Sequence, residues 1–156
     1  MNKQLLHEKI IQALEEAYRV ATDAALQAHD TATNKESVAE NKYDTFGLEA
    51  SYLAHGQAKR VSEYKANIDA YKKLVINSFS SKSSIKLGAF IQIECENGLE
   101  QNLFLGPNSG GLKLFYDDKE ICLITVSSPL GNALLGCRIG DEVVVQHKFY
   151  QVTNIY

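Results

Sequence analysis

The feature that most constrains this chain is a proline-free, alanine-rich stretch from Lys3 to about Val75, in which apolar residues recur every three or four positions. That spacing is typical of amphipathic α-helices, because it places the apolar side chains on one face. Two such stripes flank a short break near 31–38, so they predict two long helices folded as an antiparallel hairpin. The first stripe comprises Leu6, Ile10, Ala13, Ala17, Val20, Ala24, Ala28 and Thr31, and the second comprises Tyr43, Phe46, Ala50, Leu53, Gln57, Val61, Tyr64, Ile68, Tyr71 and Val75.

Length, charge and cysteine content exclude several classes of protein. The 156 residues suffice for one ordinary domain or two small ones. A formal net charge of −3 argues against a broad nucleic-acid-binding face, which needs clustered lysine and arginine. The three cysteines (Cys95, Cys122 and Cys137) form no CxxC and are odd in number, which favours a reducing compartment. Charges every few residues in 1–19 fit neither a signal peptide nor a membrane span, so we expect a cytoplasmic protein.

The second half of the chain follows a different pattern. Five serines in 77–88 indicate a linker, and from Ala89 onward polar and apolar residues alternate with the period of two typical of strands. Asn97-Gly98 predicts a β-hairpin, and the sequence of 127–136, with a proline near its start and a glycine at its end, predicts a short helix. We therefore expect an α+β chain: a coiled-coil finger over 1–76, a linker over 77–86, and over 87–156 an antiparallel β domain of about five strands and one helix.

Motifs of self-contained catalysis are absent from the sequence. It contains no P-loop, GxGxxG, HExxH or GxSxG, and no two of its four histidines lie four residues apart. The glycines of 106–111 indicate a loop and not a phosphate site, because no helix follows them. We therefore expect the protein not to be an enzyme itself.

The most suggestive cluster is the acidic segment "KESVAENKYD" (35–44), which carries Glu36, Glu40 and Asp44 at the break between the two predicted helices. One interpretation is a solvated turn, in which Ser37 and Glu40 form an S-x-x-E capping box. The other is that these carboxylates form the working end of the hairpin. The residues alone leave both interpretations open.

Two stretches carry a resemblance to a known family. "TVSSPLGNALLGCRIGDEVVV" (125–145) contains Ser128-Pro129, then 133–136 (Ala-Leu-Leu-Gly), then Gly140-Asp141. In this order these features closely resemble the C-terminal signature of the bacterial Gre-type transcription factors (GreA/GreB). "AENKYD" (39–44) is similar to that family's "SENAEY", and Glu40-Asn41 match its Glu-Asn pair.

The resemblance implies an FKBP-like C-terminal domain that docks at the rim of the RNA polymerase secondary channel, and a finger that enters the channel. In the family an Asp and a Glu at the end of the finger hold a Mg²⁺ ion shared with the polymerase, and they promote cleavage of backtracked RNA. Glu40 matches the Glu and is the implied metal ligand. Ser37 stands where the Asp is expected, which leaves Glu36 and Asp44 as further candidate acids.

The implied partner is core RNA polymerase, which this chain would contact through residues of the acidic segment and of the C-terminal signature. No cofactor is expected on the chain alone, contact with the nascent RNA is expected only indirectly, and a monomer is favoured. Two alternatives remain: a coiled-coil regulatory protein without cleavage stimulation, and an FKBP-type peptidyl-prolyl isomerase. The candidate contact residues are Asn41, Tyr43, Ser128, Pro129 and Leu130.

Overall fold

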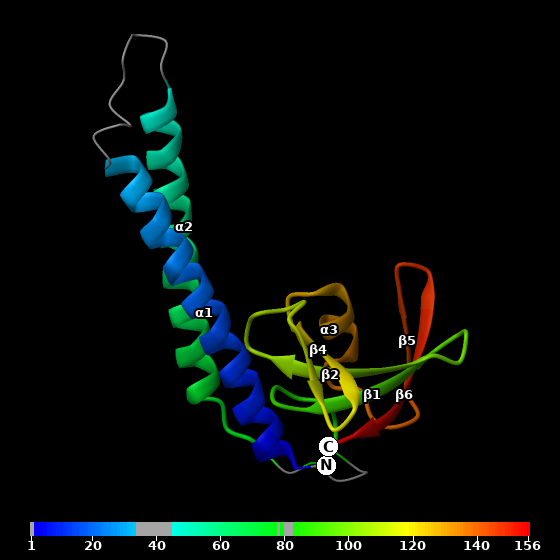
Figure 1. Cartoon of the computed structure of the whole chain (residues 1–156). Coiled ribbons are helices and arrows are strands. Elements are labelled where there is room, and N and C mark those ends of the chain that lie inside the picture. The colour runs from blue at the N-terminus through cyan, green and yellow to red at the C-terminus, as the bar shows by residue number, and fades with distance from the viewer. Residues whose placement is uncertain (1, 34–44, 78, 80–82) are drawn as a thin grey trace. The chain divides into compact units, whose positions relative to one another are not determined.

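The computed structural model describes residues 2–33, 45–77, 79 and 83–156, and within them the chain forms three helices and six strands (Figure 1). The elements are α1 (Lys3–Thr33), α2 (Phe46–Lys72), β1 (Phe90–Cys95), β2 (Glu100–Gly106), β3 (Lys113–Tyr116), β4 (Lys119–Thr125), α3 (Pro129–Leu134), β5 (Glu142–Val145) and β6 (Lys148–Ile155). This order confirms the predicted fold class, a helical hairpin followed by a sheet domain with one short helix.

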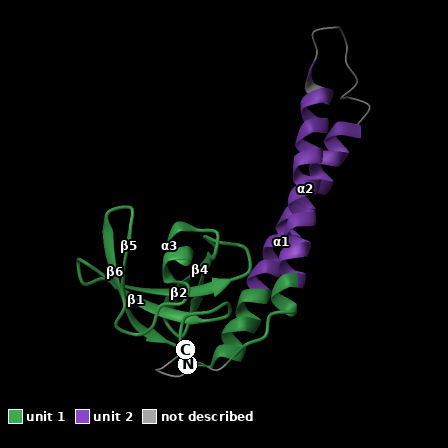
Figure 2. Cartoon of the chain, turned by 180° about the vertical axis from the view of Figure 1, so that it is seen from behind, with its two compact units in different colours: residues 1–11, 70–156 green, residues 12–69 purple. Residues whose placement is uncertain are grey.

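The two long helices run side by side as a hairpin (Figures 1 and 2). The side chain of Asn2 caps the N-terminus of α1: its Oδ1 accepts hydrogen bonds from the backbone N–H groups of Gln4 and Leu5 at 3.1 and 3.2 Å. Each helix buries one narrow stripe and leaves its remaining faces to solvent, as the three-and-four spacing predicts. The buried apolar residues along the hairpin are Leu6, Ile10, Leu14, Ala21 and Ala28 of α1 and Ala50, Ile68 and Tyr71 of α2.

The predicted stripes are wrong at particular positions. Val20 is 55 % exposed while the neighbouring Ala21 is buried, and in α2 Leu53 is 56 % exposed. An alanine-rich helix has few large side chains to mark its buried face. A stripe assigned one residue off therefore still fits the three-and-four spacing. Val75 also lies outside the helix and is 69 % exposed.

The sheet has the strand order β3-β4-β2-β1-β6-β5. The prediction of a purely antiparallel sheet is wrong for one pair, because β2 and β4 run parallel, with Asn102 opposite Ile121. The described residues form six strands and not about five. The turns 117–118 and 146–147 each have two residues with positive φ, and the flanking strands extend up to them.

Both faces of the sheet contribute to the core. One face packs with α3 and centres on Ile91, Ile93 and Leu103, which are at most 3 % exposed. On the other face Phe104 lies beside Tyr71, near the end of α2, with ring centroids 6.4 Å apart. Because both aromatic rings are fully buried, the last turn of α2 is part of the folded core of the sheet domain.

The chain divides into two compact units (Figure 2). Residues 12–69 form one unit, and residues 1–11 with 70–156 form the other. Near the end of the predicted linker, the backbone of Ile85 donates to the carbonyl of Cys137 at 2.8 Å and accepts from the N–H of Gly136 at 2.9 Å. The predicted division at 76 and 86 stays a prediction.

Candidate functional site

The start of α3 is built by local hydrogen bonds. Ser128 is the N-cap: its Oγ accepts from the N–H of Gly131 at 3.1 Å and donates to the carbonyl of Thr125 at 2.7 Å. Pro129 follows as the first helical residue, where its missing N–H is not needed. A Cβ at Gly131 would lie 2.0 Å from the Thr125 carbonyl oxygen, so only glycine allows this close approach. The Ser-Pro-Leu-Gly sequence therefore fixes a tight strand-to-helix connection.

A cleft of about 700 Å³ opens beside this connection. Four segments line it: the loop after β2, the end of β4, the start of α3 and the turn between β5 and β6. Apolar and polar groups are mixed along its walls, which is typical of sites that bind another molecule. Its lining residues include Pro107, Asn108, Ile124, Ser128, Pro129, Leu130, Gln146 and Tyr150.

The three predicted contact residues of the C-terminal signature all line this cleft. Pro129 is exposed, whereas Ser128 and Leu130 are half-buried. Leu130 also packs against the core that lies under α3, so it serves the fold as well as the surface. Whether these residues contact a partner stays a prediction, but the structure brings them together on one concave surface.

Other residues of the cleft carried no signal in the sequence. Asn108 belongs to the glycine-rich loop, and Gln146 and Tyr150 come from the last hairpin, 12 and 16 residues beyond the end of α3. The backbone of Asn108 is also fixed by a hydrogen bond, because its carbonyl accepts from the Tyr71 hydroxyl at 3.0 Å. Burial raises the pKa of Tyr71, so its phenol stays protonated and able to donate. The loop that forms one wall of the cleft is thus attached to the last turn of α2.

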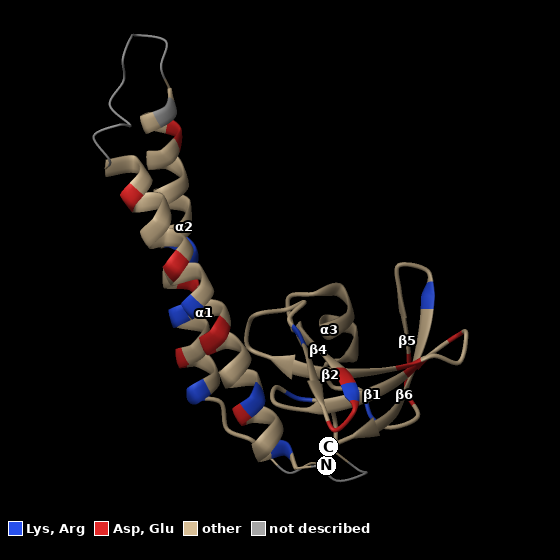
Figure 3. Ribbon diagram, in the orientation of Figure 1, with Lys and Arg blue, Asp and Glu red and all other residues tan. Residues whose placement is uncertain are grey.

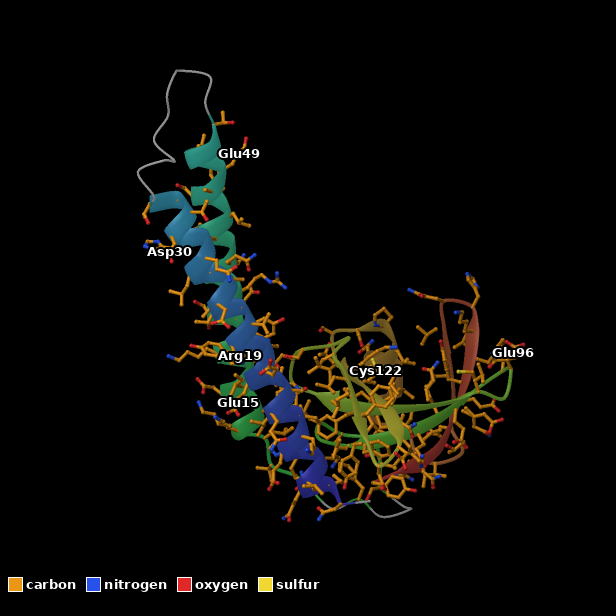
Figure 4. The ribbon with its side chains drawn as sticks, in the orientation of Figure 1. Glu15, Arg19, Asp30, Glu49, Glu96 and Cys122 are labelled. Carbon is orange, nitrogen blue, oxygen red and sulfur yellow. The ribbon has the colours of Figure 1, made fainter. Side chains whose placement is uncertain are left out.

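The thiol in the cleft is unsuited to nucleophilic chemistry. Figure 4 labels Cys122, which lies on β4, and burial raises the pKa of its thiol. Burial is also the main cause that raises the pKa of Cys137. A thiol with a raised pKa is protonated at neutral pH and is a poor nucleophile. The thiol of Cys122 is therefore a poor candidate for a nucleophile in this cleft.

The candidate residues Glu36, Glu40, Asn41, Tyr43 and Asp44 lie outside the described residues. Within residues 2–33, 45–77, 79 and 83–156, no group of three or more His, Cys, Asp or Glu side chains is placed to hold a metal ion. In the same part of the chain, no helix combines the length and apolar character needed to span a membrane. The predicted Mg²⁺ ligand Glu40 accordingly stays a prediction.

The chain is therefore a two-part protein: a long helical hairpin precedes a mixed sheet domain. The short capped helix of that domain borders a cleft. No family model matches the chain. A curated relative does: the chain is 25 % identical to the transcription elongation factor GreA of Rhodospirillum rubrum over 138 residues, which is 85 % of this chain and 81 % of that protein. The resemblance to Gre-type factors is confirmed, because the chain is similar to GreA over most of its length.

Similar solved structures carry the name Gfh1. The chain is 20 % identical to the GreA factor homolog 1 (Gfh1) of Thermus thermophilus, with 94 % of each chain covered and a TM-score of 0.40. It is 19 % identical to Gfh1 of Thermus aquaticus, with 93 % of this chain and 92 % of that one covered and a TM-score of 0.40.

Proposed function

We propose that this protein is a cytoplasmic Gre-like factor that binds core RNA polymerase at its secondary channel and modulates transcript elongation. The observation that carries the proposal is the match to GreA over 85 % of the chain, which includes both the hairpin and the sheet domain. The cleft beside α3 supports it, since the residues of the Gre-type signature line a concave surface. In this proposal the sheet domain docks on the polymerase and the hairpin reaches into the channel.

In this proposal the acidic segment supplies the carboxylates that promote RNA cleavage by the polymerase. Mg²⁺ bound between Glu40 and carboxylates of the polymerase would supply electrostatic stabilisation for hydrolysis of backtracked RNA. Glu36 or Asp44 provides the second acid, because Ser37 stands at the position of the family's Asp. The polymerase carries out the hydrolysis, and this chain contributes only ligands.

Docking is tested by pull-down of core RNA polymerase with the full chain. We expect Pro129→Ala combined with Leu130→Ala to weaken binding by roughly tenfold or more, because both side chains line the cleft. Leu135→Ala is the matched control, since Leu135 follows α3, is 46 % exposed and is not part of the cleft lining. Failure of the unmodified chain to retain polymerase would leave a coiled-coil protein with another partner as the better account.

The isomerase alternative is separated by a proline-isomerisation assay on a short peptide. Peptidyl-prolyl isomerases of the FKBP type need an aromatic-lined pocket, whereas Tyr150 is the single aromatic residue among the described residues that line the cleft. We expect no acceleration of isomerisation by the full chain.

A further inference from the structure

The sheet surface opposite α3 carries a row of carboxylates that crosses four strands. Glu94 of β1 lies directly opposite Glu100 of β2 on one side and Gln151 of β6 on the other, and Gln151 lies opposite Glu142 of β5. Side chains at directly opposed positions project from the same face of a sheet. Three carboxylates and one amide therefore stand side by side in a single row.

The next row of the same face is apolar at the sheet edge. Two residues along β6 and β5 from the first row, and therefore on the same face, are Phe149 and Val144. Glu96, the first residue after β1, lines the same depression as Glu94, Glu142 and Phe149. Val144 lies opposite Phe149, and the two side chains are 58 % and 51 % exposed. Glu96, which Figure 4 labels, follows the end of β1. Its N–H donates to the carbonyl of Phe149 at 3.3 Å. We call this surface the acidic–apolar face: Glu94, Glu96, Glu100, Glu142, Val144 and Phe149.

Part of the acidic–apolar face is hollowed, and its carboxylates lack ion-pair partners among the described residues. A depression of about 270 Å³ lies over Glu94, Glu96, Glu142 and Phe149. None of the four carboxylates of the acidic–apolar face (Glu94, Glu96, Glu100 and Glu142) forms an ion pair within the part of the chain that the structure describes. Like charges directly opposed on a sheet destabilise it, and Glu94 faces Glu100 in this way. Figure 3 shows acidic residues on these strands.

In the neighbouring row of the same face, the polar side chains form hydrogen bonds with one another. Gln92 donates to Asn102 at 2.9 Å and accepts from Asn154 at 3.1 Å, so these amides satisfy one another across three strands. The carboxylates one row further have no comparable partners among the described residues. Packing in the core on the other side of the sheet does not require glutamates at these positions, because their side chains project away from it. The acidic–apolar face is therefore suited to an external partner.

We infer that the acidic–apolar face docks a basic segment of a partner protein, whose Lys or Arg side chains lie along Glu94, Glu100 and Glu142 while an apolar side chain packs against Val144 and Phe149. Charge complementarity selects this occupant. Nucleic acids and anionic membranes would be repelled by the carboxylates, and a second copy of the face placed against the first would oppose like charges. This inference goes beyond the proposed function and does not depend on it.

The test is an NMR titration of the full ¹⁵N-labelled chain with a synthetic probe peptide of alternating lysine and valine. We expect amide shifts at Glu94, Glu96, Val144 and Phe149, and binding that weakens by roughly tenfold when salt rises from about 50 mM to about 300 mM. A peptide with glutamine in place of each lysine reports the apolar contact alone and is expected to bind at least tenfold more weakly.

Variants assign the contact to the face. Glu94→Gln with Glu100→Gln is expected to weaken binding of the lysine peptide by roughly tenfold, and both glutamines keep the size and exposure of the originals. The matched control is Asp117→Asn with Asp118→Asn, which changes the net charge equally at the β3–β4 turn. Absence of binding, equal loss in both variants, or amide shifts confined to other surfaces would each overturn the inference.

Discussion

Tyr71 links the last turn of α2 to the loop that forms one wall of the cleft. It is fully buried, and its hydroxyl donates to the carbonyl of Asn108 at 3.0 Å. Its own carbonyl lies 2.8 Å from Nε2 of His7 in α1. We predict that Tyr71→Phe lowers the free energy of unfolding by about 0.5–1.5 kcal/mol, because the hydrogen bond is lost while the ring still packs. Urea denaturation measures the change, and an unaltered midpoint would show that the hydroxyl contributes nothing.

Gly106 is coupled to the same hydroxyl. A Cβ at Gly106 would lie 1.9 Å from Oη of Tyr71 and 2.9 Å from its Cζ. We predict that Gly106→Ala costs about 1–3 kcal/mol through overpacking. Combining it with Tyr71→Phe should cost clearly less than the two single changes summed, because the closest clashing atom is gone. Strict additivity in this double-mutant cycle would contradict the close packing of the two residues.

Glu94 provides the residue-level test of the acidic–apolar face as a strained surface. It lies directly opposite Glu100, so Glu94→Gln removes a repulsion and should raise the free energy of unfolding by about 0.2–1 kcal/mol. Glu120→Gln serves as the control, because Glu120 pairs with Lys113 at 2.6 Å and its neutralisation should bring no gain. A lower thermal midpoint for Glu94→Gln would show that the carboxylate is stabilising where it stands.

Among the elements, α3 is short and relies on the cap that the Ser128 side chain provides. It has only six residues, so it cannot persist without its cap and its contacts with the sheet. Ser128→Ala removes the cap and should lower the free energy of unfolding by about 0.5–2 kcal/mol. Ser128→Asp should recover part of the loss, since a carboxylate can accept from Gly131 N–H but cannot donate to Thr125. Equal stability of the alanine variant and the original would contradict the capping role.

How much each element could be predicted depends on how local its determinants are. The short helix was predictable because Ser128, Pro129 and Gly136 lie within one short stretch of sequence, and Gly136 adopts the positive φ of 86° expected after a helix end. The pairing of β2 with β4 was not, since alternation indicates that a strand exists without naming its neighbour. In α1 the burial of Ala21 in place of Val20 shows the same limit, because small residues fix the helix face weakly.

At the scale of the whole molecule, the candidate site was predictable only in part. Ser128, Pro129 and Leu130 could be selected from one continuous motif, and the structure places all three at the cleft. The other walls come from the loop after β2 and from the last hairpin, which meet α3 only through the tertiary fold. No local pattern marks Asn108 or Tyr150 as members of such a surface. The acidic segment 35–44 lies outside the described residues, so its role depends on experiment.

The central claim is that this chain acts on RNA polymerase through its acidic segment. The most direct measurement is a transcript-cleavage assay on a backtracked elongation complex with the cognate polymerase. We predict faster, Mg²⁺-dependent shortening of the RNA with the full chain, lost in Glu40→Ala and kept in Glu63→Ala, an exposed acid of α2 outside the segment. Glu40→Ala should itself cost no more than about 2 kcal/mol of stability, since its structural role is at most that of a cap partner.

Displacement of a known channel factor without RNA shortening would contradict the role of the acids and leave a regulator that occupies the channel. The absence of both RNA shortening and displacement would contradict the proposal as a whole.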